Sequence, residues 1–189
     1  MSAPSFTAGN TAMLLIAHQV GDVGRVRAIP FERMEANAMA LARTAKANGI
    51  PLLFASTMDA YVPGPLPAAL EEDSPEGVKA RIERQGGVHV VDEEDFASVV
   101  GETGRKKLIT AGVSNDVCTV HLALTALRLG YEVEVVADAG GPPPKIGQDF
   151  ALRRMRGAGA AITSTAQIMA ELLHVWAGRR DGKIVPFVM

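Results

Sequence analysis

The sequence contains a single cysteine, Cys118, so no disulfide can form within the chain. One thiol in 189 residues is typical of proteins kept in a reducing compartment, and we expect a cytoplasmic protein. Residues 1–10 lack the basic and apolar stretches of a secretory signal. The longest apolar run, residues 12–17, is far too short to span a bilayer. These absences argue against the secreted and membrane-spanning classes.

The sequence also lacks an excess of charge of either sign. Its 19 basic and 21 acidic residues leave a net charge of −2, which provides no general attraction for nucleic acid or anionic membranes. We therefore expect neither as a partner. With 48% hydrophobic residues, a chain of this length can bury a sizeable core, which predicts one globular domain over residues 1–189.

Short apolar runs alternate with segments whose apolar residues recur at helical spacing. The runs predict strands at 12–17, 50–56, within 82–91, and at 108–111, 131–137 and 160–163. The periodic segments predict helices at 31–48, 66–72, 92–102, 115–129, 148–156 and 165–177. Residues 73–79 read as solvated surface. This alternation indicates an α/β fold with a parallel sheet covered by helices on both faces.

Within the predicted helix at 115–129, one set of apolar residues recurs at the spacing of a buried helix face. These residues are Val117, Val120, Leu124 and Leu127.

Polar residues follow three of the predicted strands. His18–Gln19, Ser56–Thr57 and the segment Gly112–Cys118 should meet at the carboxyl edge of the sheet, where open α/β folds place their sites. Cys118 lies in the first turn of a predicted helix, and the partial positive charge of a helix N-terminus favours a thiolate. The sequence therefore makes Cys118 a candidate nucleophile.

The motif Gly112-Val-Ser-Asn-Asp-Val-Cys118, followed by Gly130-Tyr-Glu-Val133, resembles the isochorismatase-like cysteine hydrolases. The remainder is most similar to their YcaC-like subfamily, through His18–Gln19, Gly64–Leu66, Arg84-x-Gly86, Asp92–Phe96 and Asp138–Gly140. This resemblance implies a doubly wound (Rossmann-like), six-stranded parallel sheet. It also implies a homo-oligomeric hydrolase of small amide-like substrates. The carboxylates, Asp59 among them, show no metal-ligand spacing, so we expect no metal and no cofactor.

By the same resemblance, Cys118 is the nucleophile, Arg84 is the cation of the catalytic triad, and the N–H groups of Val117 and Cys118 form an oxyanion hole. A cis peptide bond is expected between Val113 and Ser114. We also expect substrate-contacting residues on the strand ends and neighbouring loops. These are Val113, Ser114, His18, Gln19, Met58 and Tyr61.

The chain departs from the family at the residue that takes the thiol proton, because the aspartate of the triad aligns with Ala17. General acid–base assistance is worth about 10²–10⁴-fold in rate. His89, His18 or Asp22 could supply the missing base, and Ala17 could also be an engineered inactivating substitution. The alternative to an active enzyme is a catalytically lapsed member that keeps a ligand pocket and an oligomer scaffold.

Overall fold

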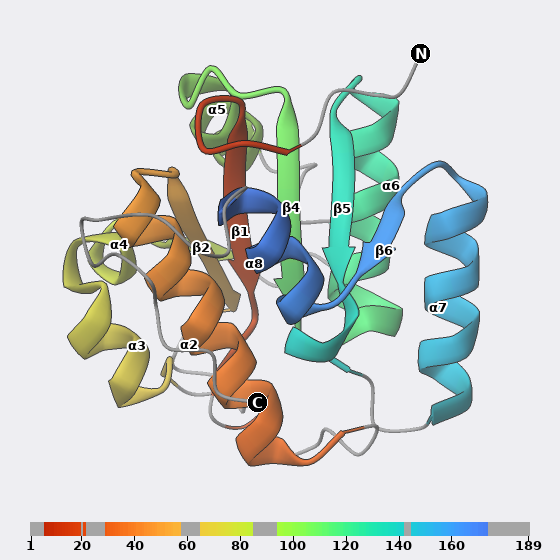
Figure 1. Ribbon diagram of the computed structural model, residues 1–189, viewed down its shortest axis with the longest axis horizontal. Coiled ribbons are helices and arrows are strands. Elements are labelled where there is room, and N and C mark those ends of the chain that lie inside the picture. The colour runs from red at the N-terminus through yellow and green to blue at the C-terminus, as the bar shows by residue number, and fades with distance from the viewer. Residues whose placement is uncertain are drawn as a thin grey trace.

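The computed structural model describes residues 6–19, 21, 29–57, 65–84, 94–141 and 145–173. Its centre is a parallel, six-stranded sheet in the order β3-β2-β1-β4-β5-β6 (Figure 1). The strands are β1 (Thr11–Ile16), β2 (Leu52–Thr57), β3 (Ile82–Arg84), β4 (Lys107–Gly112), β5 (Glu132–Val136) and β6 (Ala161–Thr163). The predicted α/β class with a parallel sheet is confirmed.

Helices cover both faces of this sheet. One face packs against α2 (Phe31–Asn48), α3 (Ala68–Asp73), α4 (Pro75–Lys79) and α8 (Thr165–Leu173). The other face packs against α5 (Glu94–Glu102), α6 (Val120–Arg128) and α7 (Lys145–Gly157). In Figure 1, α2 and α8 lie in front of the strands, and α5 and α6 lie behind them. No helix in the described ranges is long and apolar enough to cross a bilayer.

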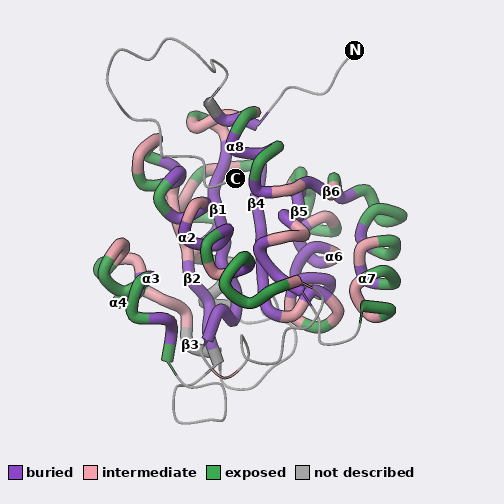
Figure 2. The backbone as a smooth tube through the Cα atoms, turned by 60° about the horizontal axis from the view of Figure 1, so that its bottom comes forward, coloured by how far each residue is buried: buried purple, intermediate pink, exposed green. Residues whose placement is uncertain are grey.

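The core consists of two layers because successive side chains of a strand point to opposite faces. In β1, Met13 and Leu15 belong to one buried cluster, whereas Leu14 and Ile16 belong to the other. Every residue of β1 and of β4 is buried, so the two central strands form the purple centre of Figure 2. This explains why the sequence shows continuous apolar runs here and no alternation.

The longest helix begins and ends where the sequence predicts. Pro30 precedes α2 with a ψ of 136°, outside the helical range, and Gly49 follows the helix with a φ of 65°. In this left-handed conformation the Gly49 N–H reaches the carbonyl oxygens of Ala45 and Lys46 and satisfies the helix end. Glycine adopts this conformation without a steric penalty.

The expectation of plain solvated surface over residues 73–79 is wrong. Pro75 occupies the first turn of α4, and Val78 is buried against the core. Proline is well tolerated at the first position of a helix because no N–H is needed there. A helix of five residues is too short to show a repeating apolar pattern, so the sequence did not reveal it.

The predicted helix at 115–129 is not a uniform α-helix. It opens with the π-helical turn η2 (Asn115–Thr119) and continues as α6. The wider turn changes which side chains face inward. Val117, predicted to be buried, is 43% exposed, and Leu124 and Leu127 are only partly buried. Leu122, Ala123 and Ala126 occupy the buried side of α6 in their place, beside Val120.

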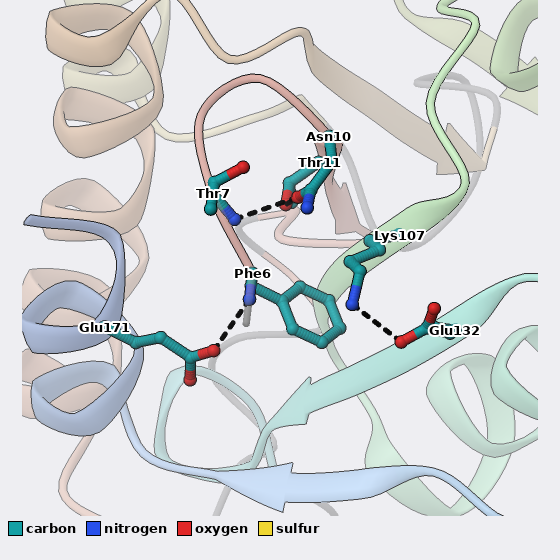
Figure 3. A network of polar contacts seen from close by, with 7 residues as sticks. All are labelled: Phe6, Thr7, Asn10, Thr11, Lys107, Glu132 and Glu171. Atoms are coloured by element: carbon teal, nitrogen blue, oxygen red, sulfur yellow. Dashed lines mark hydrogen bonds and ion pairs between the residues drawn. The ribbon is translucent and has the colours of Figure 1, made fainter. Parts of the chain in front are cut away.

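The amino-terminal segment is attached to the amino edge of the sheet (Figure 3). The Phe6 N–H donates a 2.7 Å hydrogen bond to Oε1 of Glu171 on α8. Nζ of Lys107, at the start of β4, lies 4.8 Å from the centre of the Phe6 ring and 2.7 Å from Oε2 of Glu132. This polar cluster therefore joins the chain's first described residues to β4, β5 and α8.

Candidate active site

Three strands end together at the carboxyl edge of the sheet. Ile16 is paired with Gly112, and the Val113 N–H donates to the Ile16 carbonyl at 3.0 Å. The Ala17 N–H donates to the Ala55 carbonyl at 2.7 Å. The ends of β1, β2 and β4 thus bring residues 17–19, 56–57 and 112–118 together, as the sequence predicts.

Cys118 lies in η2, immediately beyond the end of β4. It is half-buried and packs against the buried cluster that contains Ile16 and Ala17. The turn is fixed to the strand by the Thr119 hydroxyl, which donates to the Gly112 carbonyl at 3.2 Å. The thiol therefore occupies a defined position at the sheet edge.

Gly112 allows this turn to approach the strand closely. A Cβ atom at Gly112 would lie 2.6 Å from Oγ1 of Thr119 and 3.1 Å from the Ile16 carbonyl oxygen. The peptide bond between Val113 and Ser114 is cis, as the resemblance implies. The motif Gly-Val-Ser before η2 is thus a tightly packed connection between strand and turn.

Ala17 is fully buried and has a φ of 54°. A side chain with a Cβ atom is strained in this left-handed conformation, and among such residues aspartate and asparagine adopt it most readily. The buried cluster that includes Ala17 is the one that Cys118 contacts. A carboxylate at position 17 would therefore fit the backbone and lie on the same face of the sheet as the thiol.

His18 points away from this face. Its Nε2 lies 2.8 Å from the Ala139 carbonyl, which can only accept a hydrogen bond, so Nε2 carries the proton. Complete burial lowers the pKa of His18, and the hydrogen bond to Ala139 opposes that effect. The imidazole also lines a void of about 10 Å³ together with residues of α2 and α3. This geometry makes His18 a neutral, anchored side chain.

A short turn after β5 organises the same edge. This turn, η3 (Ala137–Ala139), supplies three carbonyl acceptors: Ala139 to His18, Asp138 to Asn37 at 2.7 Å, and Ala137 to Asn115 at 3.4 Å. Sequence reasoning did not assign Asn37 a role. The available signal was an amide within the apolar stripe of α2, because buried polar side chains need a partner.

One of the two proposed oxyanion donors already has a hydrogen-bond partner. The Val117 N–H makes a long hydrogen bond of 3.4 Å to the Ser114 carbonyl, well beyond the usual range. Such a weak bond is readily exchanged for one to a developing oxyanion. Ser114 is half-buried, whereas Val113 is buried beside Met34.

The structure describes some of the remaining predicted site residues fully, some by their backbone alone, and some not at all. Arg84 ends β3 and is paired with Thr57, so its backbone lies at the same edge, but its side chain is outside the description. Gln19 is buried at the end of β1. The residues outside the described ranges are His89, Met58, Tyr61 and Asp22. Among described residues, no group of three or more histidine, cysteine or acidic side chains could hold a metal.

Comparisons with known proteins identify the family of this chain. The sequence model of the isochorismatase domain matches residues 11–167. The protein named "Probable hydrolase YcaC" from Escherichia coli strain K12 is 34% identical over 173 residues, which cover 92% of this chain and 82% of the relative.

Two solved structures of YcaC proteins superpose closely on this fold. YcaC from Pseudomonas aeruginosa, with hexane-2,5-diol and covalent acrylamide, has a TM-score of 0.91 at 32% identity, covering 97% of this chain and 90% of its own. YcaC from E. coli, an octameric hydrolase of unknown specificity, has a TM-score of 0.88 at 33% identity, covering 93% and 85%. The chain therefore belongs to the isochorismatase family, in which its relatives include the YcaC hydrolases.

Proposed function

We propose that this protein is a homo-oligomeric cysteine hydrolase of small amide-like substrates. The Cys118 sulfur attacks the substrate carbonyl and forms a carbon–sulfur bond while the carbonyl oxygen becomes an oxyanion. The N–H groups of Val117 and Cys118 stabilise that charge. The carbon–nitrogen bond breaks, the amine leaves with a proton, and water then releases the acid and restores the thiol.

The position of Cys118 carries this proposal. Cys118 lies in the first helical turn after β4, at the carboxyl edge of the sheet, where open α/β folds place their sites. It packs on the same face of the sheet as Ile16 and Ala17. The covalent acrylamide in the P. aeruginosa relative adds support, because acrylamide is an electrophile that thiols attack readily. Arg84 would supply positive charge near the sulfur, and His89 would accept the thiol proton less effectively than the absent carboxylate.

The deciding experiment restores a carboxylate at position 17. Ala17→Asp should raise kcat/KM for amide hydrolysis by roughly 10²-fold or more, within the range of acid–base assistance. Ala17→Asn is the matched control, because asparagine suits the same backbone conformation but cannot take a proton at neutral pH. Both variants are compared by thermal denaturation, and Cys118→Ser should abolish any gain.

A second candidate is a catalytically lapsed protein that retains the pocket, and Ala17 is the observation that favours it. This alternative predicts no hydrolysis by Ala17→Asp across amides, esters and nitriles, and no labelling of Cys118 by acrylamide in a mass spectrum. If the wild-type protein is active, His89→Asn should abolish turnover without changing the melting temperature. Unchanged kinetics would remove His89 from the mechanism.

A further inference from the structure

Asp138 joins the turn after β5 to two helices on one face of the sheet. Its Oδ1 accepts hydrogen bonds from the Thr165 N–H at 2.7 Å and from the Thr165 hydroxyl at 2.8 Å, at the first residue of α8. The Asp138 carbonyl accepts from Nδ2 of Asn37 on α2 at 2.7 Å. Hydrogen bonds to a carboxylate are stronger than those between neutral groups. Asp138 therefore fixes η3 between α2 and α8.

The two neighbours of Asp138 in η3 hold parts of the candidate site. The Ala139 carbonyl accepts from Nε2 of His18, just beyond the end of β1, at 2.8 Å. The Ala137 carbonyl accepts from Nδ2 of Asn115, the first residue of η2, at 3.4 Å. These carbonyl groups belong to consecutive residues joined by planar peptide bonds, so they cannot move independently. A shift of Asp138 therefore displaces both neighbouring hydrogen bonds.

The start of η2 is sensitive to such a shift. Asn115 is completely buried, and its Oδ1 has no hydrogen-bond partner within the described part of the chain. Its bond to the Ala137 carbonyl is already long, so a small further displacement of η3 would break it. Leaving another buried polar atom unpaired is costly, so the turn would have to rearrange. Cys118 follows three residues later in the same turn.

We propose that Asp138 is a positioning residue for the nucleophile. Its carboxylate holds η3 against α8, and η3 holds the start of η2, so that the Cys118 sulfur and the two oxyanion N–H groups keep their places. This inference rests on the proposed function of Cys118. The Asp138 carboxylate bonds to α8, on the face of the sheet opposite the cluster that Cys118 contacts. Asp138 therefore acts through the backbone and does not replace the missing base.

Alkylation of Cys118 by iodoacetamide tests this role without requiring hydrolysis. The rate is measured by intact mass across a range of pH, on variants shown to be folded by circular dichroism. Asp138→Ala removes both hydrogen bonds to Thr165. It should slow alkylation several-fold at neutral pH and move the half-maximal rate to higher pH, because the N–H groups that favour a thiolate lose their fixed places. Asp138→Asn keeps an acceptor oxygen and should restore most of the wild-type profile.

Turnover provides a second measurement. With an amide that the wild-type protein hydrolyses, Asp138→Ala should lower kcat by roughly tenfold with little change in KM, since a misplacement of about 1 Å can cost as much as about 100-fold. Thr165→Val removes only the hydroxyl donor and should show the same effects more weakly. This milder variant carries the test if Asp138→Ala does not fold.

Ser164→Ala is the matched control at the same helix end. The described hydrogen bonds of the Ser164 hydroxyl go to Gln167 within the first turn of α8. Its loss should weaken the start of α8 and leave the alkylation profile unchanged. The proposal is overturned if Ser164→Ala reproduces the effect, or if Asp138→Ala is alkylated like wild type or faster at every pH. A wild-type Cys118 that iodoacetamide does not label would instead overturn the proposed nucleophile, and this inference with it.

Discussion

At the scale of single residues, the buried His18 contributes to the pH dependence of folding stability. Its Nε2–H is bonded to the Ala139 carbonyl, whereas Nδ1 is buried and has no hydrogen-bond partner within the described part of the chain. Burial lowers the pKa of His18 below its usual range. The unfolded chain therefore binds a proton at a pH where the folded protein does not, so the free energy of unfolding decreases as the pH falls below about 6.5.

His18→Gln should remove this dependence. A glutamine amide can donate to the Ala139 carbonyl from nearly the same place and does not titrate. Urea unfolding of the wild-type protein should show stability rising with pH up to about 6.5, by at most about 1.4 kcal/mol per pH unit for one proton. The variant should lose that slope. Equal slopes in both proteins would show that His18 does not titrate on unfolding.

The side chain at position 17 shows a limit of sequence reasoning. The apolar run predicts a strand through Ala17, yet the strand ends at Ile16 and Ala17 has a left-handed backbone. Nothing in alanine's own preferences indicates this conformation. In contrast, the place of Cys118 at the edge of the sheet could be predicted, because a strand, a glycine turn and a helix start are each visible in the sequence.

At the scale of elements, the turn after β5 and the end of β4 are held in unusually close contact. A Cβ atom at Gly140 would lie 2.2 Å from the Gly112 carbonyl oxygen and 3.2 Å from Oδ1 of Asn115. Backbone atoms cannot move aside as a flexible side chain can. This contact joins η3 to the strand from which η2 and Cys118 follow.

Gly140→Ala should therefore lower the free energy of unfolding by about 3 kcal/mol or more, at the upper end of the cost of overpacking. Gly101→Ala is the matched control, because a Cβ atom there meets nothing within 4 Å and its φ is not left-handed. Alanine suits a helix better than glycine, so the control should be neutral or slightly stabilising. Similar denaturation midpoints for the two variants would contradict the close contact.

Element boundaries could be predicted where proline or glycine marks a helix end, and not where such residues or a repeating pattern are lacking. Pro30 and Gly49 bracket α2, and the predicted and observed limits coincide. The helix α4 and the π-helical turn η2 were missed because neither leaves a repeating pattern in so few residues. The loop residues His89, Met58 and Tyr61 lie outside the described ranges, so their roles remain predictions.

At the scale of the whole molecule, a second buried group opposes the effect of His18. Glu134 on β5 has its pKa raised chiefly by burial and next by the nearby Glu171, while a hydrogen bond from Thr163 and the charge of Lys107 act in the opposite direction. Between about pH 4.5 and the raised pKa of Glu134, the folded protein holds a proton that the unfolded chain has released. Stability due to Glu134 therefore decreases as the pH rises through its raised pKa.

Glu134→Gln should remove this opposing slope and expose that of His18. The variant should be more stable than the wild-type protein at neutral pH, and its stability should rise more steeply between mildly acidic and neutral conditions. Denaturation midpoints measured at closely spaced pH values would reveal both effects. Glu102→Gln, at an exposed position, should reproduce the wild-type profile, and a Glu134→Gln profile parallel to wild type would contradict the assignment.

The wide turn of η2 places a constraint on the length of the chain. Between Ser114 and Val120 the backbone hydrogen bonds join residues five apart, one residue more than in an α-helix. Deleting a single residue from η2 would convert the wide turn into an ordinary α-helical turn. Either the Cys118 sulfur would then move away from the strand ends, or the buried face of α6 would rotate towards solvent. The position of the Cys118 sulfur and the burial of α6 thus depend on the same number of residues in this turn.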